Sequence, residues 1–239
     1  MERLDKLLSS TGRWSRREVK ELLRQGRVTV DGCPARAAEQ KLEPGTVCLA
    51  VDGEPLQLER FTYIMLHKPA GLLSATEDSR QPTVLDLLPP ELRRRGLAPV
   101  GRLDKDTEGL LLLTNDGELT HRLLSPKYHV DKVYFARVDG TLTQEAVAAF
   151  AAGLTLEDGL RCLPARLELL PAGQVRVTLR EGKFHQVKRM LAACGAPVTY
   201  LKRLSMGPLQ LDESLAPGAW RPLTREEQAA LSGCDKPGI

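Results

Sequence analysis

The 239-residue sequence predicts an α+β protein made of two parts. The first 60 residues have the pattern of two short helices followed by short strands. From Phe61 onward, short strands, turns and short helices follow one another without the regular strand–helix alternation of a parallel α/β fold. We therefore expect residues 1–58 to form a small N-terminal module, and residues 59–239 to form a larger domain with a mainly antiparallel, mixed β-sheet flanked by short helices.

Composition and charge exclude several classes of protein. Hydrophobic residues make up 42% of the chain and charged residues 27%, so a packed core is expected and general disorder is not. The 34 basic and 31 acidic residues leave a net charge of only +3, so any nucleic-acid surface must come from local clusters of basic residues. Aromatic residues reach only 4%, which argues against a broad base-stacking surface.

The sequence contains no apolar run of the ~18 to 20 residues that a membrane span needs. The beginning of the chain carries acidic residues and has no long apolar stretch, so we expect no signal peptide and a cytoplasmic protein. The cysteines are odd in number, scattered and without a C-x-x-C pair: Cys33, Cys48, Cys162, Cys194 and Cys234. Reduced thiols are expected, and a disulfide framework, a zinc site or redox chemistry is not.

The N-terminal module begins with two helical segments. An amphipathic segment covers Arg3 to Leu8, and Ser15 with Glu18 forms a capping box that opens a second helix, which Gly26 closes. A strand and turn follow at residues 27–32. A second turn and a short apolar run lie within residues 41–51, and residues 53–60 have the composition of a linker.

Basic residues recur on one side of the second helix. Arg16, Lys20 and Arg24 are spaced four apart, Arg17 adds a further charge, and residues 1–27 have eight basic and four acidic side chains. Such a stripe is usually a solvated helix face, and it is also the pattern that binds nucleic-acid phosphates. The stripe alone does not decide between these interpretations.

Alternating and apolar runs predict the elements of the larger domain. Strands are expected at 63–66, 109–113, 133–138 and 174–179. Helices are expected at 117–124, 144–152 and 184–194, and a capping box at Thr224 and Glu227 predicts a terminal helix of structural use.

The segment from Gly101 to Gly117 contains the densest group of charges beside a buried strand. Four consecutive leucines follow the carboxylates Asp104, Asp106 and Glu108, and the cations Arg102 and Lys105 stand among them. Charged residues at the end of a buried strand indicate a cleft. A salt-bridged turn, a metal site and a glycosidase pair fit the same pattern, and composition does not choose among them.

A second charged segment runs from Arg180 to Arg203, with six basic residues and one acidic residue. In a helix over 184–194, Lys188 would flank the apolar stripe and reach inward, whereas Arg189 would point away from it. His185 is a candidate general base, although a histidine among cations more often forms hydrogen bonds or contacts RNA.

Taken together, these motifs resemble a known family. Residues 1–50, with R-V-x-V-D-G at 27–32, resemble the S4-type RNA-binding module. The motifs K-P-x-G (68–71), G-R-L-D-x-D-T-x-G-L-L-L-L-T-x-D-G (101–117), K-x-Y (132–134) and E-G-K-x-H-Q-V-K-R-M (181–190) occur in the order typical of an RNA pseudouridine synthase. Within that family the chain is most similar to the type that modifies small-subunit ribosomal RNA (RsuA type).

The resemblance implies a role for each matching residue. Asp104 would be the catalytic nucleophile, Lys188 its ion-pair partner and Arg102 a second support, and Tyr134 would stack on the target uracil. An RNA contact is implied for a set of cations, namely Arg16, Arg17, Lys20, Arg24, Lys183, His185 and Arg189. Lys183 and Lys188 stand where many pseudouridine synthases have arginine, and lysine lacks the bidentate geometry of a guanidinium.

The implied reaction isomerises uridine to pseudouridine, which conserves every atom, so no metal or other cofactor is expected. The expected partner is ribosomal RNA or an assembling small ribosomal subunit, and the expected state is a monomer. The sequence leaves open whether Asp104 attacks the base, attacks the sugar or removes a sugar proton. The alternatives are a large-subunit synthase of the same branch, a catalytically silent RNA-binding assembly factor and, further away, a metal-dependent phosphoester hydrolase.

Overall fold

The computed structural model describes residues 1–35, 37–56, 58 and 60–233 of the chain. These residues group into two compact units. Unit 1 comprises residues 1–62 together with 88–98, and unit 2 comprises residues 63–87 and the chain from 99 onward. The domain boundary between residues 58 and 59 therefore stays a prediction. The sequence pattern did not indicate that residues 88–98 group with unit 1.

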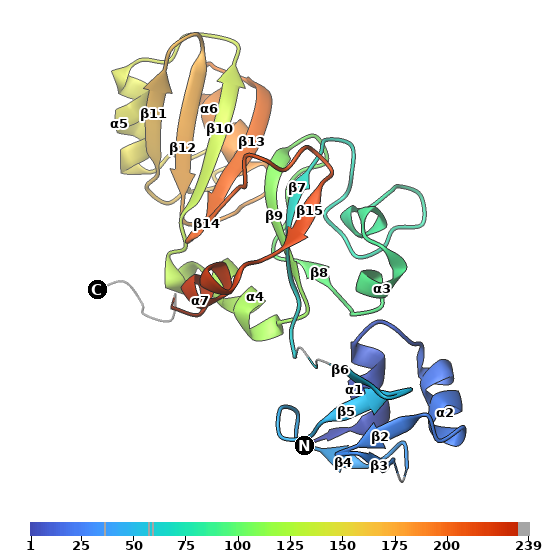
Figure 1. Ribbon diagram of the computed structural model, residues 1–239. Coiled ribbons are helices and arrows are strands. Elements are labelled where there is room, and N and C mark those ends of the chain that lie inside the picture. Colours follow the sequence, from blue (N-terminus) through green and yellow to red (C-terminus); the bar gives the residue numbers. More distant parts are fainter. Residues whose placement is uncertain (36, 57, 59, 234–239) are drawn as a thin grey trace. The chain divides into compact units, whose positions relative to one another are not determined.

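Unit 1 is a small α+β module (Figure 1). Its elements are β1 (Glu2–Arg3), α1 (Leu4–Ser10), α2 (Arg16–Arg24), β2 (Val28–Val30), β3 (Cys33–Pro34), β4 (Lys41–Leu42), β5 (Leu49–Val51), β6 (Glu54–Leu56) and α3 (Pro90–Arg93). Four of the strands form an antiparallel sheet in the order β3-β2-β5-β6, and β1 pairs with β4. Apolar residues of both long helices and of the strands form one core, which includes Leu4, Leu8, Val19, Val28 and Leu49.

The helix α2 begins and ends where the sequence predicts. The Ser15 side chain accepts a hydrogen bond from the Glu18 backbone nitrogen, and the Glu18 carboxylate accepts one from the Ser15 nitrogen at 2.6 Å. Gly26 follows the helix with a φ of +68°, a left-handed conformation that suits glycine. The expected linker at 53–60 is wrong in part, because β6 pairs with β5 there; its residues 57 and 59 lie outside the described residues.

Unit 2 contains one long mixed sheet and several short helices (Figure 1). Its elements are β7 (Tyr63–Lys68), the 3-10 helix η1 (Val84–Leu87), β8 (Ala98–Pro99, at the unit boundary), β9 (Glu108–Thr114), α4 (Gly117–Leu124), the 3-10 helix η2 (Pro126–Tyr128), β10 (Lys132–Val138), α5 (Gln144–Ala152), β11 (Arg166–Leu170), β12 (Gln174–Leu179), α6 (Gln186–Ala193), β13 (Val198–Met206), β14 (Leu209–Gln210), β15 (Trp220–Pro222) and α7 (Arg225–Ser232). The main path of the sheet runs β11-β12-β10-β13-β9-β7-β15. Every pair on this path is antiparallel except β13 with β9, so two antiparallel halves meet at one parallel pair.

The two halves of this sheet meet at a glycine. Gly109 pairs with Arg203 and has a φ of +106°, and a Cβ at Gly109 would lie 2.2 Å from the Arg203 carbonyl oxygen. The Arg203 side chain is fully buried beside this point and donates a hydrogen bond from Nε to the Leu110 carbonyl at 2.8 Å. The loop that precedes Gly109 is therefore anchored at the centre of the sheet.

Most predicted elements of unit 2 are confirmed, since α4, α5 and β12 have the predicted ends and β7, β9 and β10 differ by one or two residues. The helix expected at 184–194 begins only at Gln186, because His185 has a φ of +50° and Phe184 belongs to the preceding turn. The capping box at Thr224 opens α7 as expected.

In the described part of the chain, no helix is long and apolar enough to span a membrane. Cys33, Cys48, Cys162 and Cys194 are free thiols, as expected, and Cys234 lies outside the described residues.

Candidate active site

The turn that carries Asp104 is held in place by a buried lysine. Lys68, at the end of β7, has no exposed surface, and its ammonium group donates hydrogen bonds to the carbonyls of Pro69, Lys105 and Thr107 at 2.9, 3.1 and 2.9 Å. Burial lowers the pKa of Lys68 to about 8. Because two of the three acceptors lie just after Asp104, this lysine fixes the backbone of the turn.

A second contact fixes the same turn from its other side. The hydroxyl of Ser74 both donates to the Leu103 carbonyl at 2.9 Å and accepts from the Leu103 nitrogen at 3.1 Å. Leu103 itself is buried, so the residue before Asp104 is held by packing as well as by hydrogen bonds. The position of the Asp104 carboxylate is therefore determined by the folded core and not by a free loop.

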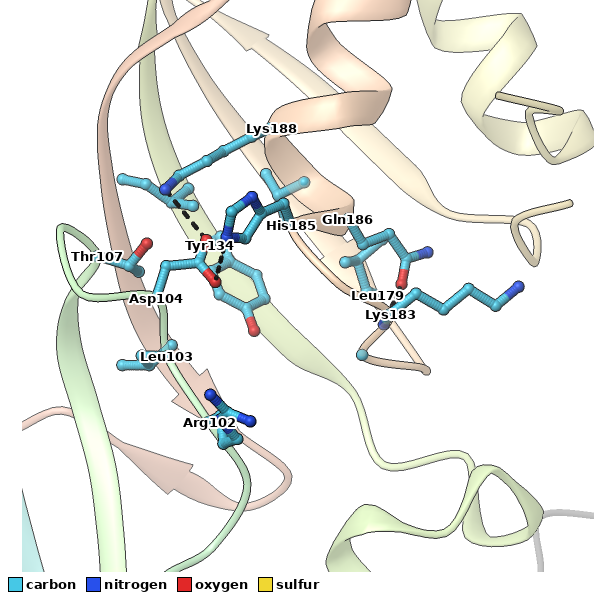
Figure 2. A pocket seen from close by; sticks show the side chains of 13 residues that line it. Arg102, Leu103, Asp104, Thr107, Tyr134, Leu179, Lys183, His185, Gln186 and Lys188 are labelled. Carbon is cyan, nitrogen blue, oxygen red and sulfur yellow. Dashed lines mark hydrogen bonds and ion pairs between the residues drawn. The ribbon is translucent and has the colours of Figure 1, made fainter. Parts of the chain in front are cut away.

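The Asp104 carboxylate contacts two basic side chains of the segment around α6 (Figure 2). Its Oδ2 lies 3.0 Å from the Lys188 ammonium nitrogen, and its Oδ1 lies 3.5 Å from Nε2 of His185. The Asp104 side chain is 26% exposed and the Lys188 side chain 23% exposed. The Asp104 carboxylate therefore lies beside a cation and remains open to a ligand.

Lys188 also contacts a second carboxylate. Its ammonium group donates to Oδ1 of Asp106 at 2.5 Å, and the Asp106 side chain is 72% exposed. The hydrogen bond from Lys188 lowers the pKa of Asp106. Burial acts to lower the pKa of Lys188, but the hydrogen bonds to Asp106 and Asp104 outweigh it, and the pKa of Lys188 is raised. Lys188 is thus held as a cation between one sheltered and one solvated carboxylate.

Asp104 and Lys188 line a small pocket at the junction of the two half-sheets (Figure 2). Tyr134, on β10, is 8% exposed and contributes its ring to the pocket wall. Leu179 and Leu201 add apolar surface. The pocket therefore offers a ring face, apolar walls and one carboxylate, which suits a flat polar ring such as a nucleobase.

The structure brings together most of the site residues predicted from the sequence. Asp104, Tyr134, Lys188, Arg102, Lys183 and His185 all line this pocket. Arg102 is exposed and, among the described residues, forms no ion pair with Asp104, so its supporting role stays a prediction. Lys183 lies 3.2 Å from Glu181, and Arg189 pairs with Asp158 at 2.6 Å, which partly neutralises both cations.

The predicted RNA-binding residues of unit 1 lie on α2. Arg16, Arg17 and Lys20 are exposed, and Arg24 pairs with Glu21 at 2.6 Å. They belong to unit 1, whereas the residues that line the pocket belong to unit 2.

The sequence did not reveal the buried polar residues whose hydrogen bonds hold the turns of the site. Lys68 stands in the K-P-x-G motif, and a lysine at the end of a buried apolar run was the available signal. Glu181 and Gln186 are buried and bonded to each other at 2.6 Å, and the Gln186 Oε1 accepts from the Lys183 nitrogen at 2.9 Å. No signal in the sequence separates such buried polar residues from exposed ones.

The three carboxylates of the loop do not gather into a metal site. Glu108 accepts a hydrogen bond from the Tyr200 hydroxyl at 2.7 Å, whereas Asp104 and Asp106 contact Lys188. Within the described ranges, no group of three or more histidine, cysteine or acidic side chains is placed to hold a metal ion.

Comparison with protein families decides the classification. Residues 62–193 match the RNA pseudouridylate synthase family, and residues 2–48 match the S4 domain. The chain belongs to the RNA pseudouridylate synthase family. It is 50% identical over 234 residues to an uncharacterised RNA pseudouridine synthase of Bacillus subtilis, YtzG, with 96% of this chain and 98% of that protein covered.

A second relative and a crystal structure agree with this. The chain is 42% identical over 231 residues to ribosomal small subunit pseudouridine synthase A of Escherichia coli, with 96% and 99% of the two chains covered. A crystal structure of a pseudouridylate synthase is 36% identical, covers 97% of this chain and 100% of its own, and has a TM-score of 0.68. This enzyme is therefore an RNA-modifying isomerase of the RsuA type with an N-terminal S4 domain, and the predicted α+β fold class is confirmed.

Proposed function

We propose that this pseudouridine synthase isomerises a uridine of small-subunit (16S) ribosomal RNA with Asp104 as its nucleophile. The observation that carries the proposal is the Asp104 carboxylate, which lies 3.0 Å from the Lys188 ammonium group in a pocket walled by the Tyr134 ring. Lysine, at the position where many relatives of the family carry arginine, balances the charge without a bidentate pair.

The reaction needs one such carboxylate. The C1′–N1 glycosidic bond breaks, the uracil turns, a C1′–C5 bond forms, and the C5 proton leaves while N1 gains a proton. No atom or electron is supplied from outside. Asp104 provides the nucleophile, Lys188 balances its charge, and the Tyr134 ring stacks on the turning base. The uridine must first leave its stack in the RNA, at a cost of roughly a few kcal/mol.

We assign RNA binding to the basic residues around the site and on α2. Lys183 and His185 line the pocket, and Arg189 follows Lys188 on α6. On α2, the set Arg16, Arg17, Lys20 and Arg24 contacts phosphates. Phosphate contacts position a protein on RNA without reading its sequence.

The choice of substrate rests on the named relatives. Similarity to small-subunit synthases extends over almost the full length of both chains, S4 domain included. We therefore assign ribosomal RNA or an assembling small subunit as the partner. The cytoplasm as the location and a monomer as the working state are proposed from the sequence.

Mapping pseudouridines in ribosomal RNA from cells lacking this protein tests the substrate. We expect one small-subunit pseudouridine to be lost and to return when the purified enzyme acts on that RNA, with release of tritium from 5-tritiated uridine. Loss of a large-subunit site with an intact small-subunit pattern would instead assign the enzyme to the large subunit. Binding without any tritium release would favour a catalytically silent assembly factor.

A further inference from the structure

Phe184 is a large aromatic side chain that the fold leaves in solvent. It is 75% exposed, whereas the other three phenylalanines are buried or half-buried. Leaving such a ring exposed forgoes the stabilisation that its burial would contribute. Because the chain has only four phenylalanines and Phe184 adjoins the catalytic pocket, its exposure calls for a function.

The turn that carries Phe184 is rigidly built. The Gln186 side chain accepts from the Lys183 nitrogen at 2.9 Å and donates to Glu181 at 2.6 Å, and Glu181 also accepts from the Leu163 nitrogen at 2.8 Å. Glu181 and Gln186 are both buried. Buried hydrogen bonds on both sides of Phe184 therefore fix the turn that holds the ring in solvent.

One face of the ring is already covered by a second ring. Phe184 and His185 are stacked, with centroids 3.8 Å apart and an interplanar angle of 19°. His185 adopts a left-handed backbone conformation, with a φ of +50°, which costs energy for a residue other than glycine. The imidazole also lies 3.5 Å from Asp104, so the stack extends from the reacting carboxylate outward to an open ring face.

An open ring face of this kind fits a nucleobase. A uridine that enters the pocket leaves its neighbours in the RNA without a stacking partner. Stacking of a base on an aromatic side chain is sequence-tolerant and contributes about 1 to 3 kcal/mol per base. The segment 180–189 also contains four basic residues and one acidic residue, which is compatible with a phosphate backbone nearby. The choice of RNA over a protein partner rests on the family of the chain.

We propose that Phe184, backed by His185, is a stacking site for an unpaired base of the substrate RNA adjacent to the target uridine. The inference rests on the proposed function, because it requires an everted uridine at Asp104. Phe184 is a positioning residue: it holds the neighbouring nucleotide and so places the uridine, without touching the reacting atoms.

Kinetics of four substitutions test this role. Phe184→Ala and Phe184→Leu should lower kcat/KM for tritium release from ribosomal RNA by roughly 5- to 150-fold, the range that corresponds to one stacked base. Most of this loss should appear in KM. Phe184→Trp and Phe184→Tyr retain a flat ring and should stay within about threefold of the wild type. The melting temperature of all four variants should be unchanged, because the side chain is exposed.

A fluorescent base tests the contact itself. In an RNA fragment that carries the mapped uridine, 2-aminopurine on its 5′ or 3′ side should be quenched on binding the wild-type enzyme at one of the two positions. The quenching should disappear in Phe184→Leu and persist in Phe184→Trp. Equal kcat/KM for the leucine and tryptophan variants, or equal quenching by them, would overturn the inference. The same result is expected if Phe184 binds a protein partner and not a base. If the wild type releases no tritium from any RNA, the proposed function fails instead.

Discussion

At the scale of single residues, two aspartates that share one lysine have different surroundings. Asp104 is three-quarters covered and faces Tyr134 across the pocket, whereas Asp106 is mostly solvated. Position thus separates the carboxylate that we propose as the nucleophile from a charge that helps to hold Lys188. The motif as a string of letters contains both aspartates and does not distinguish them.

Lys68 offers a test of how firmly the Asp104 turn is held. In Lys68→Met the three carbonyls that the ammonium group satisfies lose their donor inside the protein. We expect the free energy of unfolding to fall by about 2 to 4 kcal/mol. Urea unfolding measures this, with Lys105→Met as control, since the Lys105 side chain is exposed and its ammonium group donates to the Gln81 side chain. Equal stability of the two variants would contradict the role of Lys68.

At the scale of elements, the sequence predicted those helices and strands whose apolar pattern is regular. The capping boxes at Ser15 and Thr224 and the four leucines of β9 are local signals, and the structure contains all three. β13 was missed because its apolar residues are interrupted by Lys202 and Arg203, and the buried Arg203 side chain bonds to a carbonyl of β9. Such a contact joins residues 93 apart in sequence, and no local pattern reveals it.

The junction of the half-sheets depends on Gly109. In Gly109→Ala the new Cβ would collide with the Arg203 backbone in a strained conformation, and we expect a loss of about 3 to 5 kcal/mol in unfolding free energy. Gly117→Ala is the matched control: Gly117 begins α4 with open space around its Cα, so alanine should be neutral or slightly stabilising. Thermal unfolding of both variants checks this, and a stable Gly109→Ala protein would contradict the described junction.

The connection between β14 and β15 contains a pH-dependent contact. Hydrogen bonds from Ser214 and Arg221 lower the pKa of Asp212 to about 2, against an ordinary value of 3.8. The unfolded chain therefore takes up this proton first, so the contribution of Asp212 to stability is present above pH 3.8 and is lost as the pH falls through about 2. Urea unfolding of wild type and Asp212→Asn should show a stability difference that shrinks between pH 5 and pH 2. A difference independent of pH would show that the carboxylate is not so paired.

At the scale of the whole molecule, an S4 domain precedes a pseudouridine synthase domain, and each was recognisable from its motifs. The separated motifs could be assigned to one site because they match a family in order. Their distances could not be foreseen, since Asp104, Tyr134 and Lys188 lie in three segments that only the sheet brings together. Residues 88–98, which pack with unit 1, had no signal in composition.

The proposed phosphate contacts of α2 can be tested separately from the proposed chemistry of the pocket. Arg16→Glu combined with Lys20→Glu should weaken affinity for ribosomal RNA and make its dependence on log[salt] less steep by roughly 1.5 to 2, the share of two phosphate contacts. Turnover of a short RNA at saturating concentration should stay near the wild-type value. Affinity measured across a salt series checks both points. An unchanged slope would remove α2 as a phosphate-binding face.

The central claim is that the Asp104 carboxylate performs the isomerisation, and a matched pair of variants tests it most directly. Asp104→Asn and Asp106→Asn each remove one negative charge beside Lys188 and keep the size of the side chain. Single-turnover tritium release from 5-tritiated small-subunit RNA should be abolished in Asp104→Asn and should stay within about tenfold of the wild type in Asp106→Asn, with RNA affinity kept in both. Full release by Asp104→Asn would contradict the account.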